Sequence, residues 1–217
     1  MRKLFDLDLP VVRAVGTLGT LMLLGFWWLI CCIPIFTVGA STTALYRVLF
    51  DLRQAKRAST GDFFRAFREN FKKATLLWLL ALLGAAILAA GYYGIALLEV
   101  NDASRLFLMI VLVALLILWL FTLVYLFPLT AFFENSVKAT IKNALLMSVS
   151  HLRQTVVCVG MTLLPIAAVL ISSYWFVYLG FVWAFVLPGV LFYVKAGQQM
   201  EAYRDFLPEE SEPEETE

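Results

Sequence analysis

Residues Gln154 to Val194 read QTVVCVGMTLLPIAAVLISSYWFVYLGFVWAFVLPGVLFYV, a run of 41 residues without Asp, Glu, Lys or Arg. A soluble domain has no use for so long an uncharged segment, whereas a bilayer requires about 20 such residues for each helical crossing. The run therefore predicts two crossings joined by a short turn. Of all 217 residues, 62% are hydrophobic and 15% are charged. The class indicated is an all-α, polytopic membrane helix bundle.

Further uncharged runs bring the predicted number of transmembrane helices to about five. The predicted spans cover residues 14–38, 75–98, 106–133, 155–172 and 177–194. The last two are divided at Ser172 to Tyr178, where serines adjoin aromatic residues that favour the membrane interface. One domain, residues 1–207, contains all five spans. The acidic tail that follows, residues 208–217, has no apolar side chain to bury and is predicted to be disordered.

The positions of Lys and Arg predict the orientation of the chain. The segments 41–74, 134–154 and 195–204 would share one face, and they contain thirteen basic residues against four on the other face. The cytoplasmic face of the membrane is expected to hold the larger number. The C-terminus is then cytoplasmic and the N-terminus outside. Basic residues before the first span disfavour its translocation, so the alternative is a re-entrant first segment that keeps both termini inside.

Three segments between the spans have the 3.6-residue periodicity of amphipathic helices, and we expect them on the cytoplasmic surface of the membrane. They cover residues 42–57, 61–74 and 135–153. In the first, apolar residues recur every three or four positions, with Arg47, Asp51 and Gln54 on the opposite side. Ser41 and Thr42 are suitable N-caps for this helix.

The second amphipathic segment combines aromatic and basic residues. It is expected to begin near Thr60 and to continue directly into the span at 75–98. Its characteristic residues are Phe63, Phe64, Arg65, Phe67, Arg68, Phe71, Lys72 and Lys73. This composition suits contact with anionic inner-leaflet lipid, and membrane topology alone would also produce it. Nucleic acid is not an expected partner, because the phenylalanines are continuous with a span.

The motif PIFTVGASTTALY, residues 34–46, joins the first predicted span to the first amphipathic helix. Pro34 ends the span, Gly39 permits the backbone to turn, and Ser41 or Thr42 starts the next helix. We interpret the motif as a structural corner. Gly39 is the residue expected to tolerate replacement least.

The predicted spans contain no Asp, Glu, His, Lys or Arg, the residue types that carry charge or protons in ion-coupled transporters and intramembrane enzymes. The single histidine, His151, has no partner at metal-ligand spacing, and Cys31, Cys32 and Cys158 lie in apolar stretches. We therefore predict no catalytic residue, no cofactor, no metal site and no enzymatic activity.

The corner motif, together with DFFRAFRENF at 62–71 and NALLMSVSHL at 143–152, resembles the YesL family of small bacterial membrane proteins. The likeness extends over residues 5–206. Members of that family have no established activity and are often encoded near carbohydrate uptake and degradation systems. The resemblance implies an accessory or regulatory component of carbohydrate uptake, with a transporter subunit or a second copy of the chain as partner. The alternative is a stand-alone permease for an uncharged solute, which needs no buried charge. Solute, partner and oligomeric state stay open.

Overall fold

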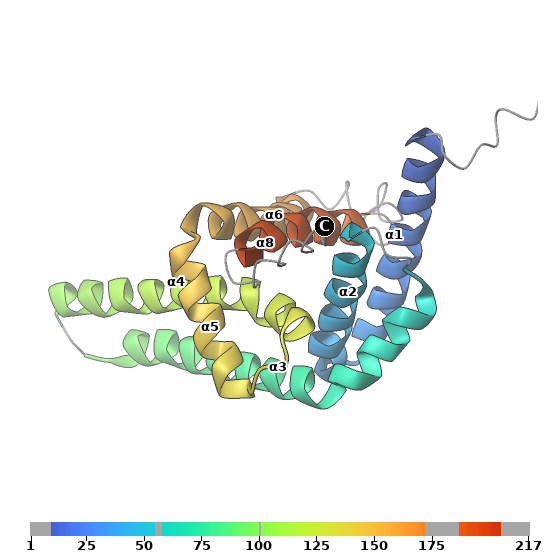
Figure 1. Ribbon diagram of the computed structural model, residues 1–217. Helices are drawn as coiled ribbons and strands as arrows, with labels where there is room; N and C mark the ends of the chain where they lie inside the picture. Colours follow the sequence, from blue (N-terminus) through green and yellow to red (C-terminus); the bar gives the residue numbers. More distant parts are fainter. Residues whose placement is uncertain (1–9, 55–57, 100, 172–186, 205–217) are drawn as a thin grey trace, which may run out of the picture.

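A computed structural model describes residues 10–54, 58–99, 101–171 and 187–204, and all regular structure in these ranges is helical (Figure 1). The elements are α1 (Pro10–Cys32), the short 3-10 helix η2 (Ile35–Thr37), α2 (Val38–Arg53), α3 (Thr60–Leu97), α4 (Asp102–Phe132), α5 (Val137–Ser150), α6 (Leu152–Ile171) and α8 (Leu187–Arg204). The predicted all-α class is confirmed for this part of the chain.

Helix α2 lies at the centre of the molecule. Each residue from Gly39 to Tyr46 is buried, and so are Val48, Leu49 and Phe50. α1, α3, α4 and α8 all pack against α2. The Phe50 ring, for example, lies 5.3 Å from the ring of Phe132 on α4 and 6.2 Å from that of Tyr203 on α8, centroid to centroid. The core of the fold is therefore assembled around this helix.

This position of α2 differs from the predicted surface helix at 42–57. The polar side was predicted correctly, since Arg47 and Gln54 are exposed. The apolar side faces neighbouring helices instead of the bilayer. Helical periodicity indicates that one side of a helix is buried, but it does not indicate what covers that side. In this protein four other helices pack against α2.

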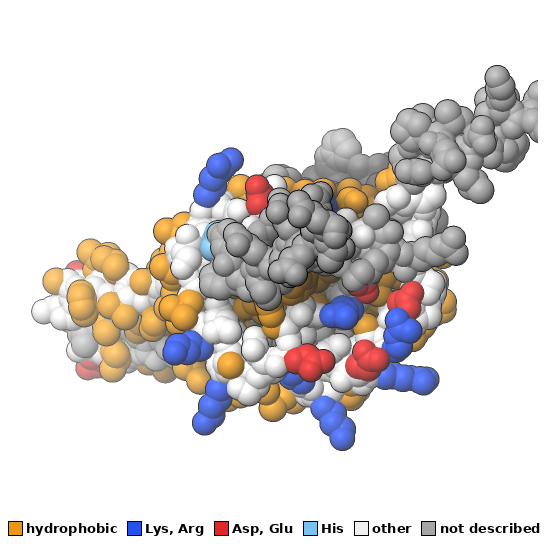
Figure 2. Space-filling model, in the orientation of Figure 1, with side chains coloured by type: hydrophobic (Ala, Val, Ile, Leu, Met, Phe, Trp, Pro, Cys, Tyr) orange, Lys and Arg blue, Asp and Glu red, His pale blue; other side chains and the backbone are white. Residues whose placement is uncertain are grey.

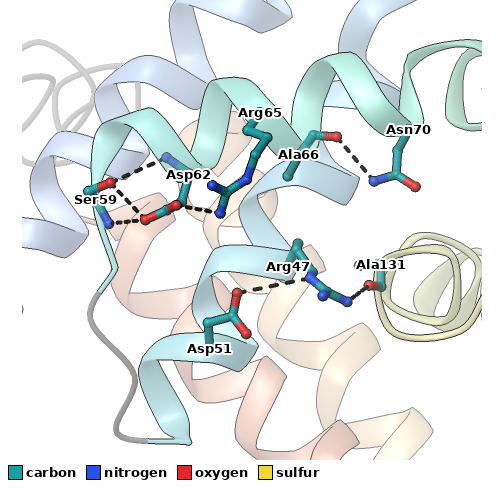
Figure 3. Close-up of polar contacts among 8 residues, drawn as sticks. All are labelled: Arg47, Asp51, Ser59, Asp62, Arg65, Ala66, Asn70 and Ala131. Carbon is teal, nitrogen blue, oxygen red and sulfur yellow. Dashed lines mark hydrogen bonds and ion pairs between the residues drawn. The ribbon is translucent and has the colours of Figure 1, made fainter.

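Helices α3 and α4 form a long antiparallel hairpin that projects from the body of the molecule (Figure 1). α3 is continuous from Thr60 to Leu97, which confirms that the aromatic and basic segment continues into the span at 75–98. The Ser59 hydroxyl accepts a hydrogen bond from the Asp62 N–H, and the Asp62 carboxylate accepts one from the Ser59 N–H at 3.0 Å (Figure 3). This capping box fixes where α3 begins.

Apolar side chains cover the projecting hairpin (Figure 2). None of the residues in the most apolar stretch of α4 is buried, and Leu83, Ile87, Leu106 and Phe107 are all more than half exposed. A surface this apolar and this large is stable in lipid and not in water. The hairpin therefore indicates a membrane protein.

The predicted count of about five spans is not confirmed. Within the described ranges, only α3 and α4 are long and apolar enough to cross a membrane, and α5 with the first part of α6 gives a third crossing if that pair, bent by 103°, is one span. The apolar stretch Gly16–Cys32 of α1 is shorter than the about 20 residues of a typical crossing and is not among these candidates. The predicted turn Ser172 to Tyr178 and the tail 208–217 lie outside the described residues, as does most of the span at 177–194.

Candidate functional site

The corner between α1 and α2 is closed by hydroxyl groups. Pro34 has extended backbone and precedes η2. The Thr37 hydroxyl donates to the carbonyls of Cys31 and Pro34 at 2.5 and 2.6 Å. The carbonyl of Cys31 is one of the last four in α1, which have no partner within a helix, so Thr37 supplies a missing donor.

Ser41 and Thr42 lie inside α2, not at its N-cap, because the helix begins at Val38 and Thr37 is the N-cap. Both hydroxyls bind Trp28 on α1. The Ser41 hydroxyl donates to the Trp28 carbonyl at 3.0 Å, and the Trp28 indole donates to the Thr42 hydroxyl at 3.2 Å. The two residues therefore fasten α2 to α1.

Gly39 lies in the first turn of α2 and packs closely against α3. A Cβ atom at this position would lie 2.6 Å from both the Ala74 carbonyl oxygen and the Trp78 Cβ. The structure thus gives a different reason for glycine here from the predicted backbone turn. The need is for close contact between two helices, not for an unusual backbone angle.

The aromatic and basic residues at the start of α3 separate onto two sides. Phe63 is fully buried, and the Phe64 ring lies 5.1 Å from the Trp27 ring of α1. The phenylalanine side packs on the protein core, which differs from the predicted lipid-facing position. Basic residues occupy the opposite side and are exposed: Arg65, Arg68 and Lys72. Their contact with anionic lipid stays a prediction.

Two of the arginines that predict the orientation of the chain also form hydrogen bonds between helices. The Arg47 guanidinium donates to the Ala131 carbonyl in the last turn of α4 at 3.1 Å, where a cation also opposes the helix dipole (Figure 3). The Arg53 guanidinium donates twice to the Tyr193 carbonyl of α8, at 3.0 and 2.7 Å, and lies 4.1 Å from the centre of the Tyr193 ring.

Pro128 interrupts the hydrogen bonding of α4, and α8 compensates. Proline has no N–H, so the Val124 carbonyl one turn earlier loses its normal donor. The side-chain amide of Gln199, itself fully buried, donates to that carbonyl at 2.9 Å. Pro128 and Gln199 therefore act as a pair that fixes α8 against α4.

A cavity of about 180 Å³ lies between α2, α4, α6 and α8. Leucine, valine and phenylalanine side chains form most of its lining. The polar residues that line it are Thr42, Tyr46, Thr162 and Lys195. Mixed linings of this kind, mostly apolar with a few polar groups, are typical of ligand pockets.

Lys195 is the only charged side chain buried within the described residues, with 6% of its surface exposed. Its ammonium donates to the Thr162 hydroxyl at 2.6 Å and lies 5.1 Å from the centre of the Phe192 ring. α8 is not among the candidate spans. Burial lowers the pKa of Lys195 to about 8, and the neighbouring Cys158 opposes part of that shift.

The sequence analysis missed this lysine because it follows the last apolar run and was counted as a flanking charge. A signal was present in the residues beyond Val194. Phe192, Ala196, Gln199 and Tyr203 recur at spacings of four, three and four, and the last three are fully or almost fully buried. Such a stripe indicates a helix that continues into the core.

No three His, Cys, Asp or Glu side chains of the described ranges come together in a way that would hold a metal ion. The apolar hairpin of α3 and α4 indicates that this all-helical structure belongs to a membrane protein. A model of the family described as "Protein of unknown function, DUF624" matches residues 21–92. This third of the chain includes the corner, α2 and most of α3. No curated protein and no solved structure matches the chain. The match assigns no activity and does not confirm the resemblance to the YesL family.

Proposed function

We propose that this protein resides in the bacterial inner membrane, catalyses no reaction, and acts as an accessory or regulatory component linked to carbohydrate uptake. The observation that carries the membrane part is the apolar hairpin of α3 and α4, which the rest of the described chain leaves largely uncovered. The carbohydrate part rests on the resemblance to the YesL family. We further propose that the C-terminus is cytoplasmic and the N-terminus outside.

The exposed basic side of α3 is the proposed contact surface for a sugar transporter subunit. Arg65, Arg68 and Lys72 lie together on this side, and charged surfaces of this kind raise association rates and select partners. The contact is therefore expected to weaken with rising ionic strength.

The test is chemical crosslinking in cells, followed by identification of the captured chains. Capture of a sugar transporter subunit is expected, and the double variant Arg68→Glu, Lys72→Glu is expected to reduce capture about tenfold. The matched control is Lys138→Glu, Lys142→Glu, which reverses two exposed charges on α5 and should leave capture unchanged. If the wild-type protein captures no such subunit, the carbohydrate link fails.

Reporter fusions at each terminus test the orientation. A reporter active only in the cytoplasm should work at the C-terminus, and one active only outside the membrane should work at the N-terminus. Cytoplasmic activity at both ends would favour the re-entrant first segment instead.

A stand-alone permease for an uncharged solute is the second candidate, and the cavity between α2, α4, α6 and α8 favours it. Liposomes that contain only this protein would then take up labelled neutral sugar faster than protein-free liposomes. Equal uptake by both would exclude the permease and leave the accessory role in place.

A further inference from the structure

The buried ammonium of Lys195 has no counter-charge among the described residues. Its hydrogen-bond partner is a neutral hydroxyl, that of Thr162. No carboxylate of the described chain lies within ion-pair distance of it. A buried charge that lacks an opposite charge is strongly unfavourable, so the site favours an anion from elsewhere.

The sequence around the site contains no acid to serve as that anion. There is no Asp or Glu between Gln154 and Lys195. The nearest acid on the same helix, Glu201, is exposed and lines a different hollow, beside His151 and Arg153. The segment that contributes Lys195 and Thr162 to the cavity therefore cannot neutralise it.

The remainder of the cavity suits an apolar chain. Leu120, Leu123 and Phe127 of α4 face Val159 and Leu163 of α6. Leu163 is 46% exposed, so the cavity reaches the outer surface of α6. A closed cavity of roughly 150 Å³ can hold benzene, so this one has room for several methylene groups.

We propose that this cavity binds a carboxylate attached to an apolar chain, such as a fatty acid, with the carboxylate on the Lys195 ammonium and the chain between α4 and α6. The ammonium then gains a charge-assisted hydrogen bond in place of an unpaired charge. A phospholipid phosphate fits less well, because its glycerol and headgroup would bury more polar atoms than the lining can bind. This inference goes beyond the accessory role and does not depend on it.

The probe is decanoate, titrated by calorimetry into the full-length protein in neutral maltoside detergent. Decanoate is expected to bind the wild-type protein, and Lys195→Met to weaken binding at least tenfold. Decanol should bind the wild-type protein at least tenfold more weakly than decanoate. The matched control, Lys142→Met, removes an exposed lysine on α5 and should bind decanoate like the wild-type protein.

A second variant, Val159→Trp, fills the cavity and leaves the ammonium in place, so it should also weaken decanoate binding. Elution volume in gel filtration and the melting temperature report whether each variant is folded; Lys195→Gln replaces Lys195→Met if the latter aggregates. The proposal is overturned if the wild-type protein does not bind decanoate, if folded Lys195→Met binds it equally well, or if decanol matches decanoate. Preference for phosphatidylglycerol over decanoate would also overturn it.

Discussion

Gly39 shows how little space separates α2 from α3. Gly39→Ala is expected to lower the free energy of unfolding by about 1–3 kcal/mol, because the new Cβ would overlap the Ala74 carbonyl and the Trp78 side chain. Gly39→Val should cost more. The control is Gly94→Ala in α3, where no atom lies within 4 Å of an added Cβ and stability should be kept or raised by up to about 1 kcal/mol. Thermal unfolding in detergent measures both, and equal melting temperatures would contradict the explanation.

The buried Lys195 makes the free energy of unfolding depend on pH. The direction of this dependence follows from its lowered pKa. Its pKa falls from 10.5 to about 8 on burial, so between these values the unfolded chain holds a proton that the folded chain has released. The free energy of unfolding therefore rises with pH across this window, and the full cost of burying the charge applies below pH 8. Without a bound anion, Lys195→Met should melt at a higher temperature than the wild-type protein at pH 7.

The measurement is the difference in melting temperature between Lys195→Met and the wild-type protein from pH 7 to pH 10. This difference should shrink as the pH rises above 8. Other titrating groups near the site, including Tyr46 and Cys158, are present in both proteins, so their effects largely cancel. If the difference in melting temperature does not change with pH, the folded protein does not bury Lys195 in its charged form.

At the scale of helices, the contact between α4 and α8 depends on Pro128 and Gln199 together. Gln199→Leu is expected to destabilise the protein by about 1–3 kcal/mol, because the half-buried Val124 carbonyl is left without a donor. In a Pro128→Ala background the helix supplies its own N–H to that carbonyl, so the same change should cost less. A double-mutant cycle on unfolding free energies measures the coupling, expected at about 1 kcal/mol. Additive effects would mean that the two residues act independently.

The helices that the sequence predicted well are those whose signals are local. The start of α3 follows from Thr60 and its capping neighbours, and its continuity agrees with the absence of proline from Thr60 to Leu97. The location of α2 was not predictable in the same way. Its apolar side is visible in the sequence, but a core helix and a membrane-surface helix have the same periodicity.

The candidate site was harder to predict, because its residues come from helices far apart in the chain. Thr42, Thr162 and Lys195 line one cavity, yet nothing in their local sequences marks them as neighbours. The compensation of Pro128 by Gln199 is likewise a long-range pairing. A proline within a predicted span does indicate that the carbonyl four residues earlier lacks its helical N–H donor. A buried side-chain amide such as that of Gln199 could therefore have been predicted as the replacement donor.

At the scale of the whole molecule, the described helices divide into a compact body and a projecting hairpin. The body contains α2 and the exposed basic side of α3, whereas the hairpin is covered by apolar side chains (Figure 2). The tip of the hairpin is polar again. Glu99 is exposed there, and the Asn101 side chain accepts a hydrogen bond from the Ser104 N–H at 2.8 Å. Polar ends on either side of an apolar middle are what a membrane crossing requires.

This division predicts that Glu99 and Arg68 lie on opposite sides of the membrane. Both belong to the same hairpin arm, and the helix between them is roughly 45 Å long at 1.5 Å per residue, more than the hydrocarbon core of about 30 Å. Each position is replaced by cysteine in a variant in which Cys31, Cys32 and Cys158 are alanine. In spheroplasts, a membrane-impermeant maleimide should label Glu99→Cys directly and Arg68→Cys only after permeabilisation. Labelling of both positions before permeabilisation would mean that α3 does not cross the bilayer, and labelling of Arg68→Cys alone would reverse the orientation deduced from the basic residues.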